Sequence, residues 1–321
     1  MNTVPTERSG TDDWFAGGTN TPGIAPDVFA MPPGLAIRYD QPAEDLRDYI
    51  TGYHVYSADS RHIGQVDWFL PGTANIRIAI DAAPFSVAIA RRTFDPVPEV
   101  SLFGATSRAL KATTNGGILV GFGVSALGWS RLFGTQAALF RDRVVPLHAA
   151  TPGNFAERLH AALSASDRQG EVAPLLDDLL RAQLGPAHRD EALIRRLMVM
   201  IAQDGTTEIV QAAEELGIEP HALRRLAIRH FGFPPKLLLR RARFLRSFLR
   251  ISQSDRTVDY AKLDESYFDV PHFLRDANTF LGMTPRRFLA LNTPFLDASL
   301  RARAAVLGAA TQALHDIGKP A

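Results

Sequence analysis

A change in the spacing of apolar residues near Pro152 limits what this chain can fold into. Before it, large apolar residues occupy every second position of ANIRIAID (74–81) and GILVGFGV (117–124), and SVAIA (86–90) and WFLP (68–71) look similar. A period of two is typical of strands with one buried face. In ANIRIAID the isoleucines are therefore expected to face a core, and Arg77, Ala79 and Asp81 to face away from it.

After Pro152 the apolar residues recur at the three-and-four spacing of helices. One or two helices are also expected earlier, within 125–140. The later segments with helical spacing cover residues 155–165, 174–184, 192–202 and 296–314. The sequence therefore predicts an α+β protein, with a mainly antiparallel β-rich N-terminal domain, barrel- or sandwich-like with a few helices, and an all-α C-terminal part.

Glycine and proline positions give the expected domain organisation. Residues 1–34 contain five prolines and five glycines and form an expected flexible arm. The side chains of the arm that could dock on the body are Trp14, Phe15, Val28 and Phe29. The other expected parts are a β-rich domain (35–150), a helical connector (151–187), a helical domain (188–293) and a C-terminal helix and tail (294–321). Leucines of the connector suit packing within the chain, and a homodimer seam is the alternative.

Composition excludes several kinds of chemistry. The chain of 321 residues has no cysteine, which excludes disulfides, cysteine-ligated zinc and thiol catalysis. Its amino terminus has no basic segment followed by an apolar run, and no window approaches the roughly 18 apolar residues that cross a bilayer. We therefore expect a cytoplasmic protein with no membrane partner.

Enzyme-like signals are weak. GFGVSALG (121–128) matches neither G-x-G-x-x-G nor G-x-S-x-G, because Ala126 and Leu127 stand where glycines are needed. Asp177 and Asp178 are interpreted as a solvated face, and His230 as a helix-end residue stabilised by the helix dipole. The nine histidines never form HxH or HxxxH, so the sequence predicts no catalytic residue, no metal site and no cofactor.

The strongest functional signal is a stretch without acidic residues. The net charge of the chain is only +1, yet residues 220–254 contain nine Lys or Arg residues and no Asp or Glu. Apolar residues that must be buried cross the whole stretch, so it indicates a folded unit with a positive surface. An anionic partner is the simplest consequence.

Two helical pairs contain or flank this stretch. In the first unit, about 207–231, a helix ending at Gly217 precedes a helix that starts at Pro220. The second unit, about 257–281, repeats this with helices expected over 257–263 and 270–280. A short second helix with polar residues in its first turns is the arrangement of a helix-turn-helix. An amphipathic helix of about 15 residues, 237–251, is expected to link the units.

Five segments carry a resemblance to a known family. They are A-x-x-L-G (213–217), LRRL (223–226), FGFPPKLLLRRARF (231–244), YFDVPHFLRD (267–276) and GMTPRRF (282–288). Through them, residues 188–292 resemble the DNA-binding domain of AraC-type (AraC/XylS) transcriptional regulators. LPG (70–72), LFGA (102–105) and GWSRLFG (128–134) resemble the sensor half of one branch of that family, and they carry no ligand residues onto this chain.

The resemblance implies a sequence-specific transcriptional regulator that binds double-stranded promoter or operator DNA through two units in successive major grooves. Outward residues of each second helix would face bases, and basic residues nearby would hold phosphates. The expected DNA-binding residues are His221, Arg224, Arg225, Arg229, Lys236 and Arg240, followed by Val270, Pro271, His272 and Arg275. Lys262, Ser266 and Ala277 depart from the family pattern, so the first unit is expected to carry most of the specificity.

Control by a small-molecule effector at the N-terminal domain is also expected, transmitted through the connector. Aromatic walls with polar tips suit such ligands, and core packing is the alternative for each aromatic residue. The candidates are Tyr53, Tyr56, Trp68 and Trp129. RNA polymerase and a second copy of the chain are further candidate partners. The rival interpretation is a metabolite-acting enzyme or ligand-binding protein whose helical domain does not bind DNA, and it predicts a convergent polar pocket in the β-rich domain.

Overall fold

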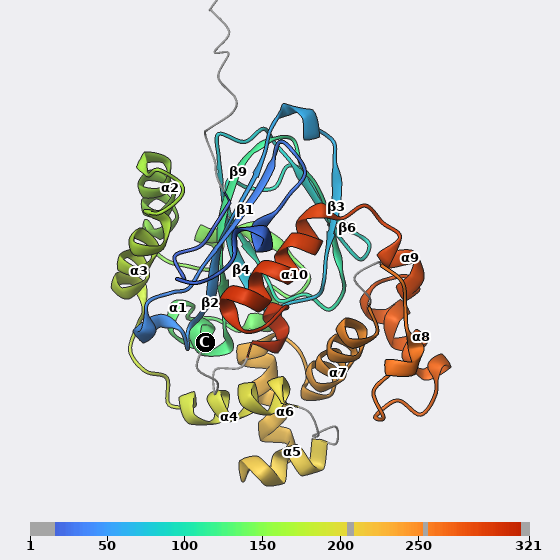
Figure 1. Cartoon of the computed structure of the whole chain (residues 1–321). Helices are drawn as coiled ribbons and strands as arrows, with labels where there is room; N and C mark the ends of the chain where they lie inside the picture. The colour runs from blue at the N-terminus through green and yellow to red at the C-terminus, as the bar shows by residue number, and fades with distance from the viewer. Residues whose placement is uncertain (1–16, 204–208, 253–255, 316–321) are drawn as a thin grey trace, which may run out of the picture.

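Two antiparallel sheets form the N-terminal half of the protein (Figure 1). The computed structural model describes residues 17–203, 209–252 and 256–315. The first sheet has six strands in the order β1 (Leu35–Asp40), β2 (Ile50–Ala58), β9 (Gly117–Val124), β4 (Ala74–Ile80), β7 (Val100–Phe103) and β10 (Val144–Pro146). The second has four, in the order β3 (Val66–Phe69), β8 (Leu110–Thr113), β5 (Ser86–Ile89) and β6 (Arg92–Phe94).

The central strand β4 is buried on both faces. Ile76, Ile78 and Ile80 are at most 1% exposed, as their spacing predicts, but Arg77 is only 8% exposed. The Arg77 guanidinium lies 5.5 Å from the ring centre of Phe69 in β3 and 4.4 Å from that of Phe103 in β7. The expectation that Arg77 faces away from the interior is therefore wrong, because residues of the second sheet cover that face.

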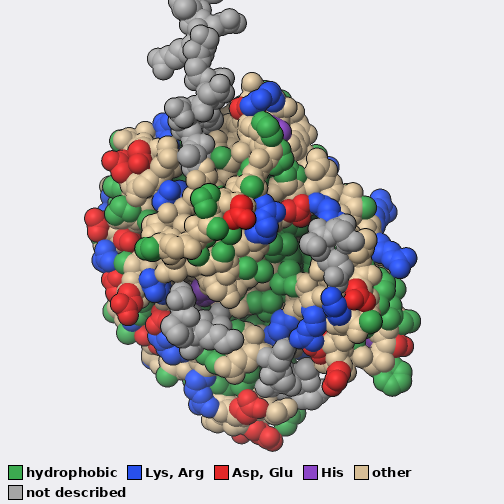
Figure 2. Space-filling model, viewed as in Figure 1, with side chains coloured by type: hydrophobic (Ala, Val, Ile, Leu, Met, Phe, Trp, Pro, Cys, Tyr) green, Lys and Arg blue, Asp and Glu red, His purple; other side chains and the backbone are tan. Residues whose placement is uncertain are grey.

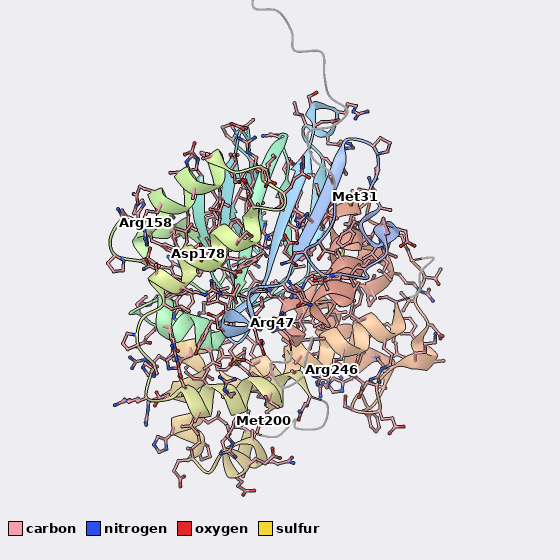
Figure 3. All side chains as sticks on the ribbon, turned by 60° about the vertical axis from the view of Figure 1, so that its left-hand side comes forward. Met31, Arg47, Arg158, Asp178, Met200 and Arg246 are labelled. Atoms are coloured by element: carbon pink, nitrogen blue, oxygen red, sulfur yellow. The ribbon has the colours of Figure 1, made fainter. Side chains whose placement is uncertain are left out.

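The connector packs within the chain, as its leucine pattern favours. Helices α2 (Phe155–Ala165) and α3 (Val172–Gln183) lie against the first sheet, with Arg158 and Asp178 on their outer sides (Figures 1 and 3). Their buried residues share one hydrophobic core with β2, β4 and β9, and include Phe155, Leu159, Leu163, Leu176 and Leu180. Since these side chains face the sheet, they are not available as a dimer seam.

Helices make up most of the described chain after residue 152. In chain order they are α4 (Glu191–Ala202), α5 (Ile209–Leu216), α6 (Pro220–Phe231), α7 (Pro235–Ile251), α8 (Val270–Phe280), α9 (Pro285–Leu289) and α10 (Pro294–Leu307). Short 3-10 helices, η6 (Tyr260–Lys262) and η7 (Gln312–Leu314), lie between or after them, and α1 (Ala126–Leu132) and η4 (Ala137–Leu139) follow β9. No helix among the described residues is both long and apolar enough to cross a membrane.

The C-terminal helix α10 returns to the β-rich half and packs on its first strand (Figure 1). Ala298, Ala302 and Val306 of α10 share a hydrophobic core with Ile37 of β1 and with Phe29. Phe29 is 7% exposed, so residues 17–34 are not a loose arm as expected, and residues 1–16 lie outside the described part of the chain. The two ends of the described chain therefore pack against each other.

A buried carboxylate fixes the start of α10. Asp67 of β3 accepts the backbone N–H groups of Phe295 (2.8 Å) and Leu296 (3.3 Å). A negative charge at this place interacts favourably with the positive end of a helix dipole. Burial, partly offset by these hydrogen bonds, raises the pKa of Asp67 to about 7.

Candidate nucleic-acid interface and ligand cavity

The first unit forms a helix-turn-helix over its described residues, 209–231. Ala213 and Leu216 of α5 pack in one core with Leu223, Leu226 and Ala227 of α6. Gly217 joins the helices at a φ of 69°, a left-handed conformation that glycine adopts without strain. All five basic candidates of this region are exposed: His221, Arg224, Arg225, Arg229 and Lys236. The predicted buried and exposed faces of α6 are thus present.

The second unit has a regular second helix and an irregular first one. Helix α8 spans Val270–Phe280, as predicted, and the Asp269 side chain caps it by accepting the N–H of His272 at 2.6 Å. The helix expected over 257–263 is wrong, because only the three-residue η6 forms there. Asp259 accepts the N–H of Ala261 and Asp264 that of Ser266. These short-range side-chain bonds compete with helical backbone bonds.

The start of α8 is less polar and less exposed than that of α6. Pro271 and Arg275 are exposed, whereas Val270 and His272 are half-buried. The His272 ring packs edge-on against that of Tyr267, with 5.0 Å between the ring centres. Phe268, in the turn before α8, is 94% exposed and was not singled out from the sequence. The second unit therefore presents an apolar and cationic edge rather than a cluster of cations.

A buried carboxylate fixes the second unit to α7. Asp276 is 1% exposed and accepts hydrogen bonds from Arg240 Nε (2.7 Å), Arg243 Nη2 (3.3 Å) and the Tyr267 hydroxyl (2.8 Å). Arg240 was expected to contact DNA. It forms an ion pair with Asp276, 2.6 Å between Nη2 and Oδ1, which joins α7 to α8, while 38% of its side chain stays exposed.

Further cations lie on α9, which the sequence analysis did not include among the candidates. Arg286 and Arg287 are exposed, and the Thr284 side chain caps this helix by accepting the N–H of Arg287. On the face of the molecule drawn in Figure 2, Lys and Arg side chains lie at the right-hand edge, where α9 lies in Figure 1. Acidic side chains gather at the bottom, over α5.

The linking helix α7 is also fixed to the β-rich half. Arg241 is 3% exposed and donates to the backbone oxygens of Gly72 (3.1 Å) and Thr106 (2.7 Å). Burial lowers the pKa of Arg241 to about 10. Gly72 ends the LPG segment and Thr106 follows LFGA, so two segments that resemble a sensor half contact α7. The backbone N–H of Ala109 also donates to the oxygen of Phe280 in α8, at 2.7 Å.

Three of the four aromatic pocket candidates are packing residues. Tyr53 and Trp129 are at most 2% exposed in the core of the first sheet, and Trp68 packs edge-on against Phe288 of α9. The Tyr53 hydroxyl donates to Asp177 Oδ1 at 2.6 Å, so Asp177 is not merely part of a solvated face. The expectation of a pocket wall is therefore wrong for Tyr53 and Trp129, whose rings fill the core, whereas Tyr56 lines two cavities.

The cavity between β4 and α10 gathers polar groups from both halves of the chain. It measures about 100 Å³ and its wall includes Arg77 of β4, Arg303 of α10 and His54 of β2. The hydroxyls of Tyr39 and Tyr56 are 2.6 Å apart, and the Tyr56 hydroxyl lies 3.1 Å from Ser299 Oγ. A second cavity of about 70 Å³ shares Tyr56, Phe69 and Arg77 with it and is lined mainly by apolar residues.

Among the described residues, no carboxylate is paired with the charged side chains of this cavity. Arg77 and Arg303 are 8% and 7% exposed, and neither forms an ion pair with any carboxylate of the described residues. Burial lowers the pKa of both arginines, and the tyrosine hydroxyls oppose that shift. Burial, together with the charges of Arg77 and Arg303, holds the pKa of His54 well below its usual value, so His54 is neutral at pH 7. The cavity therefore carries a net positive charge.

His188 and Asp190, just before α4, and His230, in the last turn of α6, could hold a metal ion. Asp190 Oδ2 lies 3.8 Å from His188 Nδ1 and 3.8 Å from His230 Nε2, and the possible ligand atoms all lie within 4.8 Å of one another. Tetrahedral zinc needs ligand atoms about 3.3 Å apart. Local spacing could not reveal this set. His230 lies in the last turn of α6, as expected, but it is buried. Because burial lowers its pKa to about 4, the expected stabilisation by the helix dipole, which needs a charged ring, is wrong.

Comparisons with known proteins give weak structural similarity. No family model and no curated protein matches the chain. ToxT from Vibrio cholerae is similar with a TM-score of 0.38 and 10% identity, over 74% of this chain and 97% of that chain. Unsaturated fatty acid-bound ToxT from strain SCE256 gives 0.40 and 8%, over 81% and 96%. The AraC-like transcriptional activator CuxR gives 0.22 and 12%, over 67% and 86%.

Scores of this size carry no argument about function, which has to be inferred from the residues of the chain. The segments that carry the sequence resemblance fold into the two units and the helix that links them. LRRL lies on α6, FGFPPKLLLRRARF ends α6 and begins α7, and YFDVPHFLRD leads into α8. In these elements, and in their order along the chain, the protein resembles AraC-type transcriptional regulators.

Proposed function

We propose that the protein is a sequence-specific DNA-binding regulator of transcription. The observation that carries this proposal is the exposed cationic face of α6, which bears His221, Arg224, Arg225 and Arg229 while its opposite face is buried. The first turns of such a helix reach base edges in the major groove, and an arginine can hydrogen-bond guanine with both arms of its guanidinium. Lys236, exposed at the start of α7, would hold a phosphate.

The second unit would extend the contact to a neighbouring groove. The 17 residues of α7 span about 25 Å at 1.5 Å per residue, and the widths of the two units add to that length. Two major-groove elements on one face of B-DNA lie about 34 Å apart. Pro271 and Arg275 of α8, with Arg286 and Arg287 of α9, would face DNA there.

In vitro selection from random duplexes with the purified full chain tests the proposal without knowledge of the operator. We expect enrichment of a sequence with two conserved blocks about one helical turn apart, bound at least 100-fold more tightly than a scrambled duplex. Affinity for both duplexes should fall steeply with salt, because phosphate contacts release counterions. No enriched sequence, or equal affinity for the scrambled control, would contradict sequence-specific binding.

The rival function is an enzyme or binding protein that uses the cavity between β4 and α10. Polar groups converge in this cavity, which is the observation that favours an enzyme or binding protein. Turnover separates the two functions: an effector should be recovered unchanged after incubation with the protein, whereas a substrate should be converted.

A further inference from the structure

Two buried arginines, Arg77 and Arg303, line the cavity between β4 and α10, and neither is paired with a carboxylate of the described residues. Arg77 has one polar side-chain partner among the described residues, Asn75 Oδ1 at 3.3 Å. Arg303 donates to Thr51 O at 3.5 Å and to the Tyr39 hydroxyl, while its Nε has no hydrogen-bond partner among the same residues. Arg241 is buried to a similar degree but donates to two backbone oxygens at 3.1 and 2.7 Å. Buried charges are normally paired, since removing them from water is costly. Two backbone oxygens therefore accept from Arg241, whereas Arg77 and Arg303 have neither a carboxylate nor a comparable pair of acceptors among the described residues.

The rest of the wall indicates what kind of anion fits. No Asp or Glu lines this cavity, and the neutral hydrogen-bonding groups near the arginines include Tyr39, Tyr56 and Ser299. The adjoining cavity shares Arg77 and is lined by Phe85, Leu119 and Phe295. Asp67 also lines this second cavity, but its oxygens accept the backbone N–H groups of α10. A small molecule with an anionic group at the arginines and an apolar part in the adjoining cavity fits the residues that line both cavities.

We propose that a small organic acid binds here as an effector, with its carboxylate held by Arg77 and Arg303 and its apolar part directed toward Phe69 and Phe295. A guanidinium can donate two parallel hydrogen bonds to a carboxylate, which makes arginine the suited residue. Arg77 belongs to the β-rich half and Arg303 to the C-terminal helix. The bound acid would therefore join α10 to β4 through one small molecule.

The position of α10 links this cavity to the DNA-binding half. Arg256 donates to the backbone oxygen of Leu289 at 2.7 Å and forms an ion pair with Asp297 of α10. Asp67 fixes the start of the same helix to β3. A change in how α10 lies on the β-rich half would thus reach the second unit directly. The connector, which was expected to transmit the signal, packs on the first sheet and forms one core with it, and α10 offers a second route.

Binding can be tested on the purified full chain without DNA. The probes are straight-chain carboxylates of two to ten carbons, the matching 1-alcohols and inorganic phosphate, with binding measured by calorimetry and thermal unfolding. We expect some of the acids to bind and raise the Tm, and the alcohols and phosphate not to. Equal stabilisation by the alcohols would overturn the role of the arginines, and tighter binding of phosphate would overturn the organic-acid class.

Variants of three arginines separate a ligand site from a structural one. Arg77→Gln and Arg303→Gln should each weaken acid binding at least tenfold. Arg301→Gln is the matched control, because Arg301 is exposed on the same helix, does not line the cavity and donates to the backbone oxygen of Ala30. Without ligand, Arg303→Gln should keep or raise the Tm, since it removes an unpaired buried charge. A strong fall in that Tm, or wild-type acid binding by both glutamine variants, would overturn the proposal. If Arg303→Gln does not fold, Arg303→Lys is measured instead, and we expect it to bind the acid more weakly than the wild type.

The regulatory part rests on the proposed DNA-binding function, and its failure can be distinguished. With a selected duplex, the acid should change the Kd for DNA at least tenfold in the wild type and not in Arg303→Gln. If the acid binds but leaves the DNA affinity of the wild type unchanged, coupling through α10 is wrong while the ligand site stands. If no duplex is bound specifically but the acid binds, the DNA-binding function fails and the ligand site again stands.

Discussion

The two units of the helical half differ in structure although the sequence presents them as copies. In the first, two helices meet at Gly217, and the start of α6 carries exposed cations. In the second, η6 replaces the first helix, and the start of α8 carries half-buried Val270 and His272. The same short-helix pattern has therefore produced one surface suited to base contacts and one suited mainly to packing.

The units also differ in what fixes them to the rest of the molecule. The first packs against α1 and η4 through α6, and its cations remain exposed. The second is fixed by buried polar contacts, with Asp276 paired to α7 and the oxygen of Phe280 bonded to Ala109. On the proposed function, this difference predicts divided roles: the first unit would recognise the DNA sequence, and the second would receive the signal from the β-rich half.

The largest expected effect comes from removing the carboxylate that fixes the second unit. Asp276→Ala leaves Arg240, Arg243 and the Tyr267 hydroxyl without their acceptor, so we expect a loss of about 3 kcal/mol in the free energy of unfolding. Urea denaturation measures it. Asp269→Ala, which removes only the cap of α8, is the control and should cost about 1 kcal/mol. If both variants lose the same free energy of unfolding, the buried contacts of Asp276 are not what fixes the second unit.

A pH effect is expected in the first unit. The pKa of His230 is lowered to about 4, below its usual 6.5, so the unfolded chain takes up the proton first and stability should fall as the pH drops from about 6.5 toward 4. The loss attributable to His230 is at most about 3 kcal/mol. His230→Gln should flatten this part of the curve of unfolding free energy against pH, whereas His221→Gln, at an exposed position, should not. An unchanged slope in His230→Gln would show that the ring is not buried as described.

Base recognition by the first unit predicts an effect that depends on DNA sequence. Arg224→Ala should cost about 1 to 3 kcal/mol on the selected duplex and much less on a scrambled one. Lys236→Ala should weaken both duplexes alike, because a phosphate contact carries no sequence information. Titrations at a fixed salt concentration measure both. An equal loss on the two duplexes for Arg224→Ala would assign it to the DNA backbone instead.

The smallest expected effect is at Arg275, the exposed basic residue of α8. Because the start of α8 is partly apolar and partly buried, Arg275→Ala should cost less than about 1 kcal/mol on the selected duplex. The comparison with Arg224→Ala is made on the same duplex and at the same salt concentration. A cost as large as that of Arg224→Ala would show that both units recognise bases and would end the division proposed above.

Local patterns in the sequence predicted the elements that depend on local forces. Apolar residues at every second position of four separate segments identified β3, β4, β5 and β9. The bounds of α2 and α8 were predicted to the residue. The exposed cations of α6 followed from the same reasoning, since the buried stripe of an amphipathic helix fixes its outer face. The helix expected over 257–263 failed because aspartate side chains satisfy the backbone there in another way.

The cavity could not be predicted, because its residues come from elements that are distant in sequence. The alternation in β4 places Arg77 opposite the isoleucines, but it does not show that a second sheet covers that side. Arg303 appears in the sequence as one of several basic residues of a terminal helix. Only the return of α10 to β1 brings the two arginines together. The same holds for His230, which comes from α6 and meets the neighbouring residues His188 and Asp190 only in the folded chain.

The return of α10 also decides how the protein can be divided for study. A fragment that ends near Pro152, where the hydrophobic period changes, would leave Leu35, Ile37 and Tyr39 of β1 without the helix that covers them. Uncovered apolar faces of this kind favour aggregation. The β-rich half is thus completed by a helix from late in the described chain, and an isolated N-terminal fragment would need α10 supplied as a separate peptide.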